Sequence, residues 1–386
     1  MKSIKLMNKI AAVGTDVFDR SVYTVSDNES APDAIMVRSA SLHEIEFPES
    51  LKAIARCGAG VNNIPTDKCA EQGIVVFNTP GGNANGVKEL AIAALILASR
   101  NISGGIEWVK TLAGTEGVAK AVEAGKGAFV GCELAGKTLG VVGLGAIGCR
   151  VANAASSLGM TVYGFDPYLS VNAAWNISIE IKKAESYDEL FSCCDYISLH
   201  VPATPETKNL ISEKTLSLMK DGVRIINLSR ADLVNADDVK KAIENGKVAC
   251  YVTDFPTEAT VGADGIINIP HLGASTNESE DNCAVMAARQ LDEYLTNGNI
   301  KNSVNFPSVS LPRQSSARVC VLHKNEDGVL SAISTALEAG SCGVDNLAHG
   351  VKGNYAYTIA ELSSVPDTAA LDAITSIDGV IKLQIF

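Results

Sequence analysis

The stretch that decides the fold is "GVVGLGAIGCRVANAASSLGMTVYGFDPY", from Gly140 to Tyr168. It begins as an apolar strand, passes through a glycine-rich turn and continues as an alanine-rich helix that leads to a second strand. Gly143, Gly145 and Gly148 have the G-x-G-x-x-G spacing. This spacing provides a tight turn, a close backbone approach to a pyrophosphate and close packing of helix on strand. The helix N-terminus adds unpaired N–H groups that favour phosphate. The stretch therefore predicts a dinucleotide-binding unit.

The acidic residue at the end of the second strand indicates which dinucleotide binds. Asp166 lies 18 residues after Gly148, where a carboxylate accepts hydrogen bonds from the ribose hydroxyls of NAD and repels the 2′-phosphate of NADP. A G-x-G-x-x-G pattern alone is weak evidence. The prediction of NAD as the cofactor depends on the strand, the helix and Asp166 that surround it.

The composition is that of a globular protein with two or three domains. The 386 residues are 46% hydrophobic and 20% charged, and the net charge of −12 argues against nucleic acid or an anionic membrane as a partner. The ten cysteines form no C-x-x-C pair and no cluster with zinc spacing, so they predict reduced thiols and no metal site. The N-terminus lacks an apolar signal core, and the most apolar run, Leu90–Ala98, is too short for a membrane span. We therefore expect a cytoplasmic protein.

About 140 residues precede the dinucleotide motif, and they also alternate strands with helices. Strands are predicted at Ala34–Val37 and near Ala53–Ala55, which implies a parallel sheet. One long apolar helix is predicted over Asn85–Gly105. Six strands follow, beginning with Leu139–Gly143, which is enough for a doubly wound domain.

The last part of the chain has a different order of elements. A second long helix is predicted over Ser275–Gly298, and a Pro- and Ser-containing stretch without periodicity follows it as a candidate linker. Residues 318–386 then read strand, helix, strand, strand, helix, strand. This βαββαβ order is the ferredoxin-like arrangement.

Three polar residues each follow a predicted strand, at the edge where an open parallel sheet holds its ligands. They are Arg230, Glu258 and His271. A histidine can take the hydroxyl proton of a hydroxy acid as hydride leaves the same carbon, a carboxylate can orient that histidine, and a guanidinium can bind the substrate carboxylate. Taken singly they are also consistent with a turn histidine, a surface ion pair and a helix cap. Together they favour hydride transfer from a hydroxy acid.

Several motifs in order along the chain resemble the D-isomer-specific 2-hydroxyacid dehydrogenases: "GKTLGVVGLGAIG", "HVPATPETKNLI", "NLSRADLV" and "PHLGAST". The N-terminal "VRSA", "RCGAGVNNI" and "NTPGGNANGVKEL" resemble the members of that family that oxidise 3-phosphoglycerate. The resemblance implies a Rossmann domain over 91–274, inserted into a discontinuous flavodoxin-like substrate domain made of 1–90 and 275–310. It also implies NAD-dependent oxidation of 3-phospho-D-glycerate to 3-phosphohydroxypyruvate in an interdomain cleft, the first step of the phosphorylated route to L-serine.

The resemblance also assigns site residues. It makes Arg230, Glu258 and His271 catalytic. The implied substrate-binding residues are Arg38, Ser39, Arg56, Gly58, Gly60, Val61, Asn78 and Lys126, and the candidates for the phosphate among them are Arg38, Arg56 and Lys126. Besides the three glycines and Asp166, the implied cofactor-binding residues are Ala146, Ile147, Pro202, Thr207, Ser229, Asp254, Gly273 and Ala274.

Two positions depart from the family pattern. Thr253 holds the place of the Asp that usually contacts the nicotinamide carboxamide, and Asp254 follows it. Either the strand is shifted by one residue or Asp254 acts from a different angle. Ala231 replaces the usual Gly after the catalytic Arg.

Residues 318–386 resemble an ACT domain, a small module that binds amino acids. His323 and Asn325 fall where serine-sensitive relatives bind L-serine, but Asp327 and Gly343 depart from that pattern. An effector site for serine and a dimerisation or tethering module both stay open.

Three other functions are compatible with parts of this sequence. A glyoxylate or hydroxypyruvate reductase is disfavoured by the candidate phosphate-binding cations and by the ACT-like tail. An NADH-sensing binding protein would be expected to have long disordered flanks, and the complete catalytic set weakens an amino-acid sensor with a vestigial dehydrogenase body. The apolar helix around Val87–Ser99 and the resemblance both predict a homodimer or homotetramer.

Overall fold

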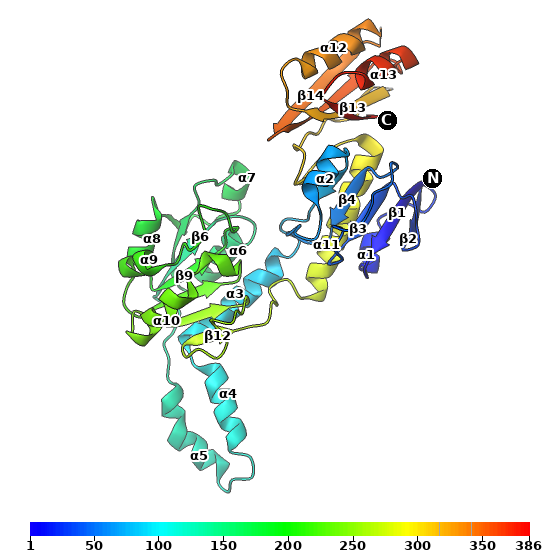
Figure 1. Ribbon diagram of the computed structural model, residues 1–386. Coiled ribbons are helices and arrows are strands. Elements are labelled where there is room, and N and C mark those ends of the chain that lie inside the picture. Colours follow the sequence, from blue (N-terminus) through cyan, green and yellow to red (C-terminus); the bar gives the residue numbers. More distant parts are fainter. Residues whose placement is uncertain (316, 341) are drawn as a thin grey trace. The chain divides into compact units, whose positions relative to one another are not determined.

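The computed structural model describes residues 1–315, 317–340 and 342–386, and its elements are labelled in Figure 1. The chain folds into two compact units. The first consists of residues 1–83 and 277–386, and the second of residues 84–276. The second unit is thus inserted into the chain of the first, which confirms the predicted class of an inserted Rossmann domain. The units divide after Asn83 and before Asn277, whereas the predicted domain limits lie after residues 90 and 274.

The first unit begins with a five-stranded parallel sheet. Its elements are β1 (Lys2–Met7), α1 (Ala12–Thr15), β2 (Tyr23–Ser26), β3 (Ala34–Val37), β4 (Ala53–Arg56), α2 (Thr66–Glu71), β5 (Val75–Phe77) and α11 (Asn277–Asn297). The order β2-β1-β3-β4-β5 is flavodoxin-like. In β3, Ala34 and Met36 pack in the cluster that includes α11, and Ile35 and Val37 pack in a second cluster. Both faces are therefore buried, which is why the strand is a continuous apolar run.

The C-terminal region of the same unit forms a separate sheet. Its elements are β13 (Ala317–Lys324), α12 (Val329–Ala339), β14 (Val344–Lys352), β15 (Tyr355–Leu362), α13 (Thr368–Thr375) and β16 (Val380–Ile385). The strands are antiparallel in the order β14-β15-β13-β16, which confirms the ferredoxin-like prediction. One cluster packs α12 and α13 on this sheet. Cys320, Leu322, Tyr357 and Ile359 of the sheet join the hydrophobic cluster of α11. The two sheets of the first unit therefore share a core.

A buried ion pair reinforces this shared core. Arg318 in β13 pairs with Glu361 on the neighbouring strand β15, and their side chains are 0% and 1% exposed. The guanidinium also donates to the carbonyl oxygen of Asn297 at the end of α11 and to that of Leu311. The carboxylate accepts two backbone N–H groups from the segment before β13. Such saturation of donors and acceptors is what a buried charge pair requires.

We predict that Glu361→Ala lowers the free energy of unfolding by about 3–5 kcal/mol, because it leaves the Arg318 guanidinium buried without its counter-charge. The double variant Arg318→Met/Glu361→Leu removes both charges and is expected to regain most of this loss. Urea unfolding of the full chain measures both values. Equal losses in the single and double variants would show that the pair does not act as a unit.

The second unit is a doubly wound domain. Its strands are β6 (Thr138–Val142), β7 (Thr161–Phe165), β8 (Lys182–Lys183), β9 (Tyr196–Leu199), β10 (Val223–Asn227), β11 (Val248–Thr253) and β12 (Ile266–Asn268). Its helices are α3 (Ala84–Ser99), α4 (Ile102–Thr111), α5 (Val118–Gly125), α6 (Gly148–Ser157), α7 (Val171–Ala174), α8 (Tyr187–Cys193), α9 (Glu213–Leu218) and α10 (Ala236–Glu244), with 3-10 turns η1 (Lys126–Phe129) and η2 (Ala231–Leu233). The parallel order β12-β11-β10-β9-β6-β7-β8 is that of a Rossmann sheet. Six of these strands were predicted from the sequence, and the two-residue strand β8 was not.

The prediction of one helix over Asn85–Gly105 is wrong. The chain forms α3 and α4 instead, and their axes differ by 67°. The break has a local cause, because the side chain of Asn101 caps α4 by accepting the N–H of Gly104 at 3.1 Å. Among the residues that the structure describes, no single helix has the length and apolar character of a membrane span, and α3 with α4 reaches that length only as this bent pair.

The helices α4 and α5 lie side by side and extend from the rest of the second unit, as Figure 1 shows in cyan. None of their residues is buried. Trp108 packs on Phe129 of η1 at 5.2 Å between ring centroids, while Ile106 and Val109 are 52% and 47% exposed. The two helices thus present apolar side chains to the surface.

Candidate active site

The glycine-rich turn between β6 and α6 is fixed by backbone packing. Gly143 has a φ of 87°, and a Cβ there would lie 2.6 Å from the carbonyl oxygen of His200. A Cβ on Gly148 would overlap the carbonyl oxygen of Gly143, whereas one on Gly145 would meet no atom within 4 Å. Gly143 and Gly148 therefore serve the packing of the chain, and Gly145 leaves one side of the turn open. The turn and the N-terminus of α6, with Ala146 and Ile147 between them, fit a pyrophosphate.

Asp166 follows β7 and ties this strand to the turn. Its Oδ2 accepts the N–H of Leu144 and its Oδ1 accepts the N–H of Tyr168, both at 2.9 Å. The remaining lone pairs of the carboxylate are available to the ribose hydroxyls of NAD. The residues present thus fit the predicted cofactor.

The loops after β9 and β10 are ordered by hydroxyl groups. Thr207 Oγ1 donates to the carbonyl oxygen of Pro202 at 2.6 Å, and Ser229 Oγ donates to that of Leu199 at 2.7 Å. These loops follow neighbouring strands at the carboxyl edge of the sheet, the edge where the glycine-rich turn also lies. His200 lies in the loop after β9, and burial lowers its pKa to about 4. Its ring therefore adds no charge beside the phosphate site at neutral pH.

Two of the three predicted catalytic residues meet on one aromatic ring. The Arg230 guanidinium lies 5.7 Å from the centroid of the Phe255 ring, and the His271 ring lies 4.5 Å from it between centroids. Phe255 follows β11, so side chains after three different strands converge here. Sequence reasoning did not single out Phe255, because an aromatic after a strand is also an ordinary core residue.

Glu258 is not held in the same way. It is exposed and makes no hydrogen bond or ion pair in the described part of the chain. Its predicted pairing with His271 stays a prediction. The charges of His271 and Arg230 act instead on the carboxyl group of Asp254, where they oppose the rise in pKa that burial causes.

Asp254 follows β11, whose last residue is the buried Thr253, and is itself 1% exposed. Its Oδ2 accepts the N–H of Gly273 at 3.1 Å, two residues after His271, and its Oδ1 has no hydrogen-bond partner among the described residues. Burial raises the pKa of Asp254, while the Gly273 N–H and the charges of His271 and Arg230 act to lower it. A buried carboxylate oxygen without a donor fits an amide such as the nicotinamide carboxamide.

The predicted substrate residues of the first unit lie after two neighbouring strands. Arg38 follows β3 and Arg56 ends β4, and Arg56 Nε donates to the carbonyl oxygen of Arg38 at 3.2 Å. Gly58 has a φ of 152° and lies against the Arg56 guanidinium, with no room for a Cβ. Asn78 Nδ2 donates to the carbonyl oxygen of Ala59 at 2.6 Å and so holds the turn that contains Gly58, Gly60 and Val61.

Two residues that shape this region, Asn8 and Glu280, are not among those predicted from the sequence. The side chain of Asn8 accepts the N–H groups of Ser39 and Ala40 at 3.1 and 2.6 Å, so the backbone amide of Ser39 is already used. Glu280, in the first turn of α11, pairs with Arg38. An Asn after a strand is a recognisable turn signal, whereas nothing local to Glu280 marks a partner 242 residues away.

Lys126 and the predicted effector residues lie elsewhere. Lys126 begins η1 in the second unit and pairs with Glu123. Both ring nitrogens of His323 have partners within the chain, the carbonyl oxygen of Lys324 at 2.8 Å and Thr358 Oγ1 at 3.0 Å. Asn325 Nδ2 donates to the carbonyl oxygen of Gly353 at 3.2 Å. These bonds occupy both ring nitrogens of His323 and one N–H of the Asn325 amide.

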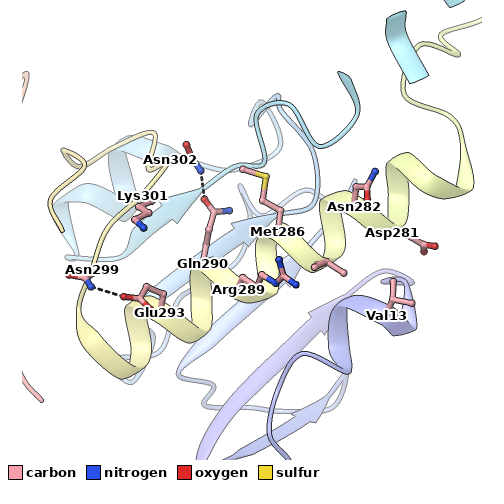
Figure 2. A pocket seen from close by; sticks show the side chains of 11 residues that line it. Val13, Asp281, Asn282, Met286, Arg289, Gln290, Glu293, Asn299, Lys301 and Asn302 are labelled. Atoms are coloured by element: carbon pink, nitrogen blue, oxygen red, sulfur yellow. Dashed lines mark hydrogen bonds between the residues drawn. The ribbon is translucent and has the colours of Figure 1, made fainter. Parts of the chain in front are cut away.

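A groove of about 820 Å³ follows α11 in the first unit (Figure 2). Figure 2 shows Asp281 and Asn282 toward one end and Glu293 toward the other, where Asn299 Nδ2 donates to Glu293 Oε1 at 2.6 Å. None of the predicted site residues lines this groove. Its lining is thus distinct from the predicted site residues, but Gln290 Nε2 of the groove donates to the carbonyl oxygen of Asn78 at 3.0 Å.

Comparisons with known proteins give the family. Residues 92–273 match the model of the D-isomer specific 2-hydroxyacid dehydrogenase, NAD binding domain. A D-3-phosphoglycerate dehydrogenase of Escherichia coli K12 is 31% identical over 354 residues, which cover 88% of this chain and 83% of that protein. The chain belongs to the D-isomer specific 2-hydroxyacid dehydrogenase family. Its cofactor is NAD, the ligand of the matched family domain.

Other members of the family differ in length. A D-3-phosphoglycerate dehydrogenase of Synechocystis is 37% identical over 287 residues, which cover 72% of this chain and 50% of the relative. The chain spans 60% of the relative from Bacillus subtilis. Among solved structures, an NAD+-bound 3-phosphoglycerate dehydrogenase of Entamoeba histolytica superposes with a TM-score of 0.61 at 27% identity, covering 79% of this chain and 98% of that one.

We predict that Gly145→Ala and Gly148→Ala differ sharply. A methyl on Gly145 points into open space at the cofactor site, so this variant folds normally and binds NADH about tenfold more weakly. A methyl on Gly148 overlaps the Gly143 carbonyl group, so this variant also loses stability, by about 2 kcal/mol or more. Fluorescence titration and thermal unfolding measure the two effects. Equal thermal stability of the two variants would contradict the packing described for the turn.

Proposed function

We propose that the chain oxidises 3-phospho-D-glycerate at C2 to 3-phosphohydroxypyruvate with NAD, the first step of phosphorylated L-serine biosynthesis. The match to the Escherichia coli relative over most of both chains supports this substrate. The single observation that carries the proposal is the placement of Arg38 and Arg56 at the carboxyl ends of adjacent strands, beside the Gly58 turn. A substrate with two anionic groups needs more cations than Arg230 alone supplies.

In this proposal the cations divide between the carboxylate and the phosphate of the substrate. Arg230 binds the substrate carboxylate and polarises the reacting oxygen, since a guanidinium matches a carboxylate through two N–H groups. Arg38 and Arg56 bind the phosphate, and Lys126 is the third candidate for it. The turn around Gly58, Gly60 and Val61 offers backbone N–H groups to the substrate, with Ser39 and Asn78 beside it.

The chemistry needs one base. His271 accepts the proton of the C2 hydroxyl, and Phe255 fixes the plane of its ring. A bound NAD would accept the hydride from C2, so the alcohol gives a hydride to NAD and a proton to His271, two electrons and two protons in all, and becomes a ketone. Glu258 is proposed to orient His271 and to stabilise its protonated form. Asp254 anchors the loop of His271 through Gly273.

The proposal extends to assembly and location. The exposed apolar side chains on α4 support a homodimer or homotetramer. All ten cysteines are free thiols, which supports a cytoplasmic location. L-serine is the candidate effector of the ACT-like region, and the internal bonds of His323 favour its other role as a tethering module.

The substrate is tested by initial rates of NAD reduction at pH about 8.5 with 3-phosphoglycerate, D-glycerate and D-lactate. We expect 3-phosphoglycerate to have a kcat/KM at least about 10²-fold higher, because only it engages the phosphate cations. Activity confined to an unphosphorylated acid would reject the proposed substrate and keep the mechanism. Addition of millimolar L-serine to the same assay tests the effector.

We predict that His271→Asn lowers kcat by about 10² to 10⁴, the usual contribution of a positioned base. The Kd for NADH is expected to change by less than about threefold, since the glycine-rich turn and Asp166 are untouched. Steady-state rates and a fluorescence titration give the two numbers. Retention of more than about a tenth of the wild-type rate would assign the base elsewhere.

A further inference from the structure

The ion pair of Arg38 and Glu280 lies among the proposed substrate residues of the first unit. Arg38 follows β3 in the sheet, and Glu280 belongs to the first turn of α11, which packs on that sheet. The two side chains are 42% and 39% exposed. Both side chains are therefore accessible to solutes while the ion pair is formed. In the described residues Glu280 is the acidic partner of the Arg38 guanidinium.

A second guanidinium lies beside this pair. Arg56 Nε donates to the carbonyl oxygen of Arg38, and its guanidinium lies over Gly58. Burial raises the pKa of the Cys57 thiol to about 12, while the positive charges of Arg56 and Arg38 both act to lower it. The same two charges act on Cys283, one turn after Glu280 on α11. Two cations and one carboxylate thus surround the same small region.

We propose that Glu280 is a specificity-determining residue that competes with the anionic group of the substrate for the Arg38 guanidinium. The inference rests on the proposed function, since it concerns the same site. The Glu280 carboxylate accepts from Nη2 of Arg38, one of the guanidinium nitrogens that a phosphate would use, and its charge repels a dianion at close range. A phosphorylated acid that binds through this nitrogen must therefore displace the carboxylate. Glu280 lowers the affinity for the phosphorylated acid and leaves the hydride-transfer step at C2 unchanged.

A merely structural role for Glu280 predicts the opposite sign. If the carboxylate served only to hold Arg38 in place for the substrate, its removal would leave the guanidinium disordered and would weaken anion binding. If Glu280 competes, its removal strengthens anion binding. The sign of the change therefore separates the two roles.

The test compares Glu280→Gln with Asp281→Asn in the full chain. Asp281 is the next residue of α11, lines the groove of Figure 2 and has no ion-pair partner in the described residues, so it controls for loss of one negative charge. Inorganic phosphate is the first probe, measured by calorimetry, and it requires no turnover. We expect Glu280→Gln to bind it about three- to fivefold more tightly, as suits a partly exposed pair, and Asp281→Asn to match the wild type.

Three further measurements show that the effect depends on Arg38 and on the charge of Glu280. In an Arg38→Gln background, Glu280→Gln is expected to change phosphate affinity by less than about 1.5-fold, because the pair is already broken. The gain is also expected to shrink as salt rises from about 20 mM to 500 mM. Glu280→Asp, which keeps the charge, should bind phosphate as the wild type does.

With 3-phosphoglycerate, the KM of Glu280→Gln is expected to fall by a similar factor while kcat stays within about twofold. Weaker or unchanged phosphate binding in Glu280→Gln, the same gain in Asp281→Asn, or no phosphate binding that depends on Arg38 would overturn the inference. Absence of wild-type turnover on 3-phosphoglycerate would reject the proposed function instead. The phosphate titration decides the role of Glu280 in either case.

Discussion

The close backbone approach at Gly143 is the constraint on which the second unit depends. The turn lies against the carbonyl oxygen of His200 after β9, and the start of α6 lies against the carbonyl oxygen of Gly143 itself. A side chain at either glycine would push the helix or the neighbouring strand away. The same approach brings the loops after β6, β7 and β9 to one edge of the sheet. There Asp166 is fixed by two backbone N–H groups, so the cofactor site is a consequence of how the central strands pack.

In the first unit, α11 links regions that are far apart in sequence. Its apolar residues Ala287, Leu291 and Tyr294 pack in one cluster with strands of the first sheet and with β13 and β15 of the second. At its C-terminal end, Arg318 binds the carbonyl oxygen of Asn297 and pairs with Glu361. At its N-terminal end lies Glu280, the partner of Arg38. The helix that completes the hydrophobic core therefore also bears a charge at the proposed substrate site.

Hydrophobic periodicity and glycine spacing were sufficient to predict most of the fold. The alternation of strands with helices predicted both parallel sheets, and the bounds of β3 were predicted residue for residue because the strand is buried on both faces. The break between α3 and α4 was missed, since an Asn cap has little weight within a long apolar run. The site was predictable where residues follow strands, as with Arg230 and His271. Glu280 and Phe255 were not, because their partners are set by tertiary packing rather than by any local pattern. Asn8 has a local turn signal, but its partners Ser39 and Ala40 are also set by tertiary packing.

The proposed reaction is a direct hydride transfer from C2 of 3-phospho-D-glycerate to NAD. It is tested most directly with substrate that carries deuterium at C2, by following the label with NMR and mass spectrometry in ordinary water. The account predicts one deuterium per turnover at C4 of the nicotinamide ring of the reduced cofactor, and none in the solvent. Recovery of the deuterium in water, or reduction of NAD without the label, would contradict it.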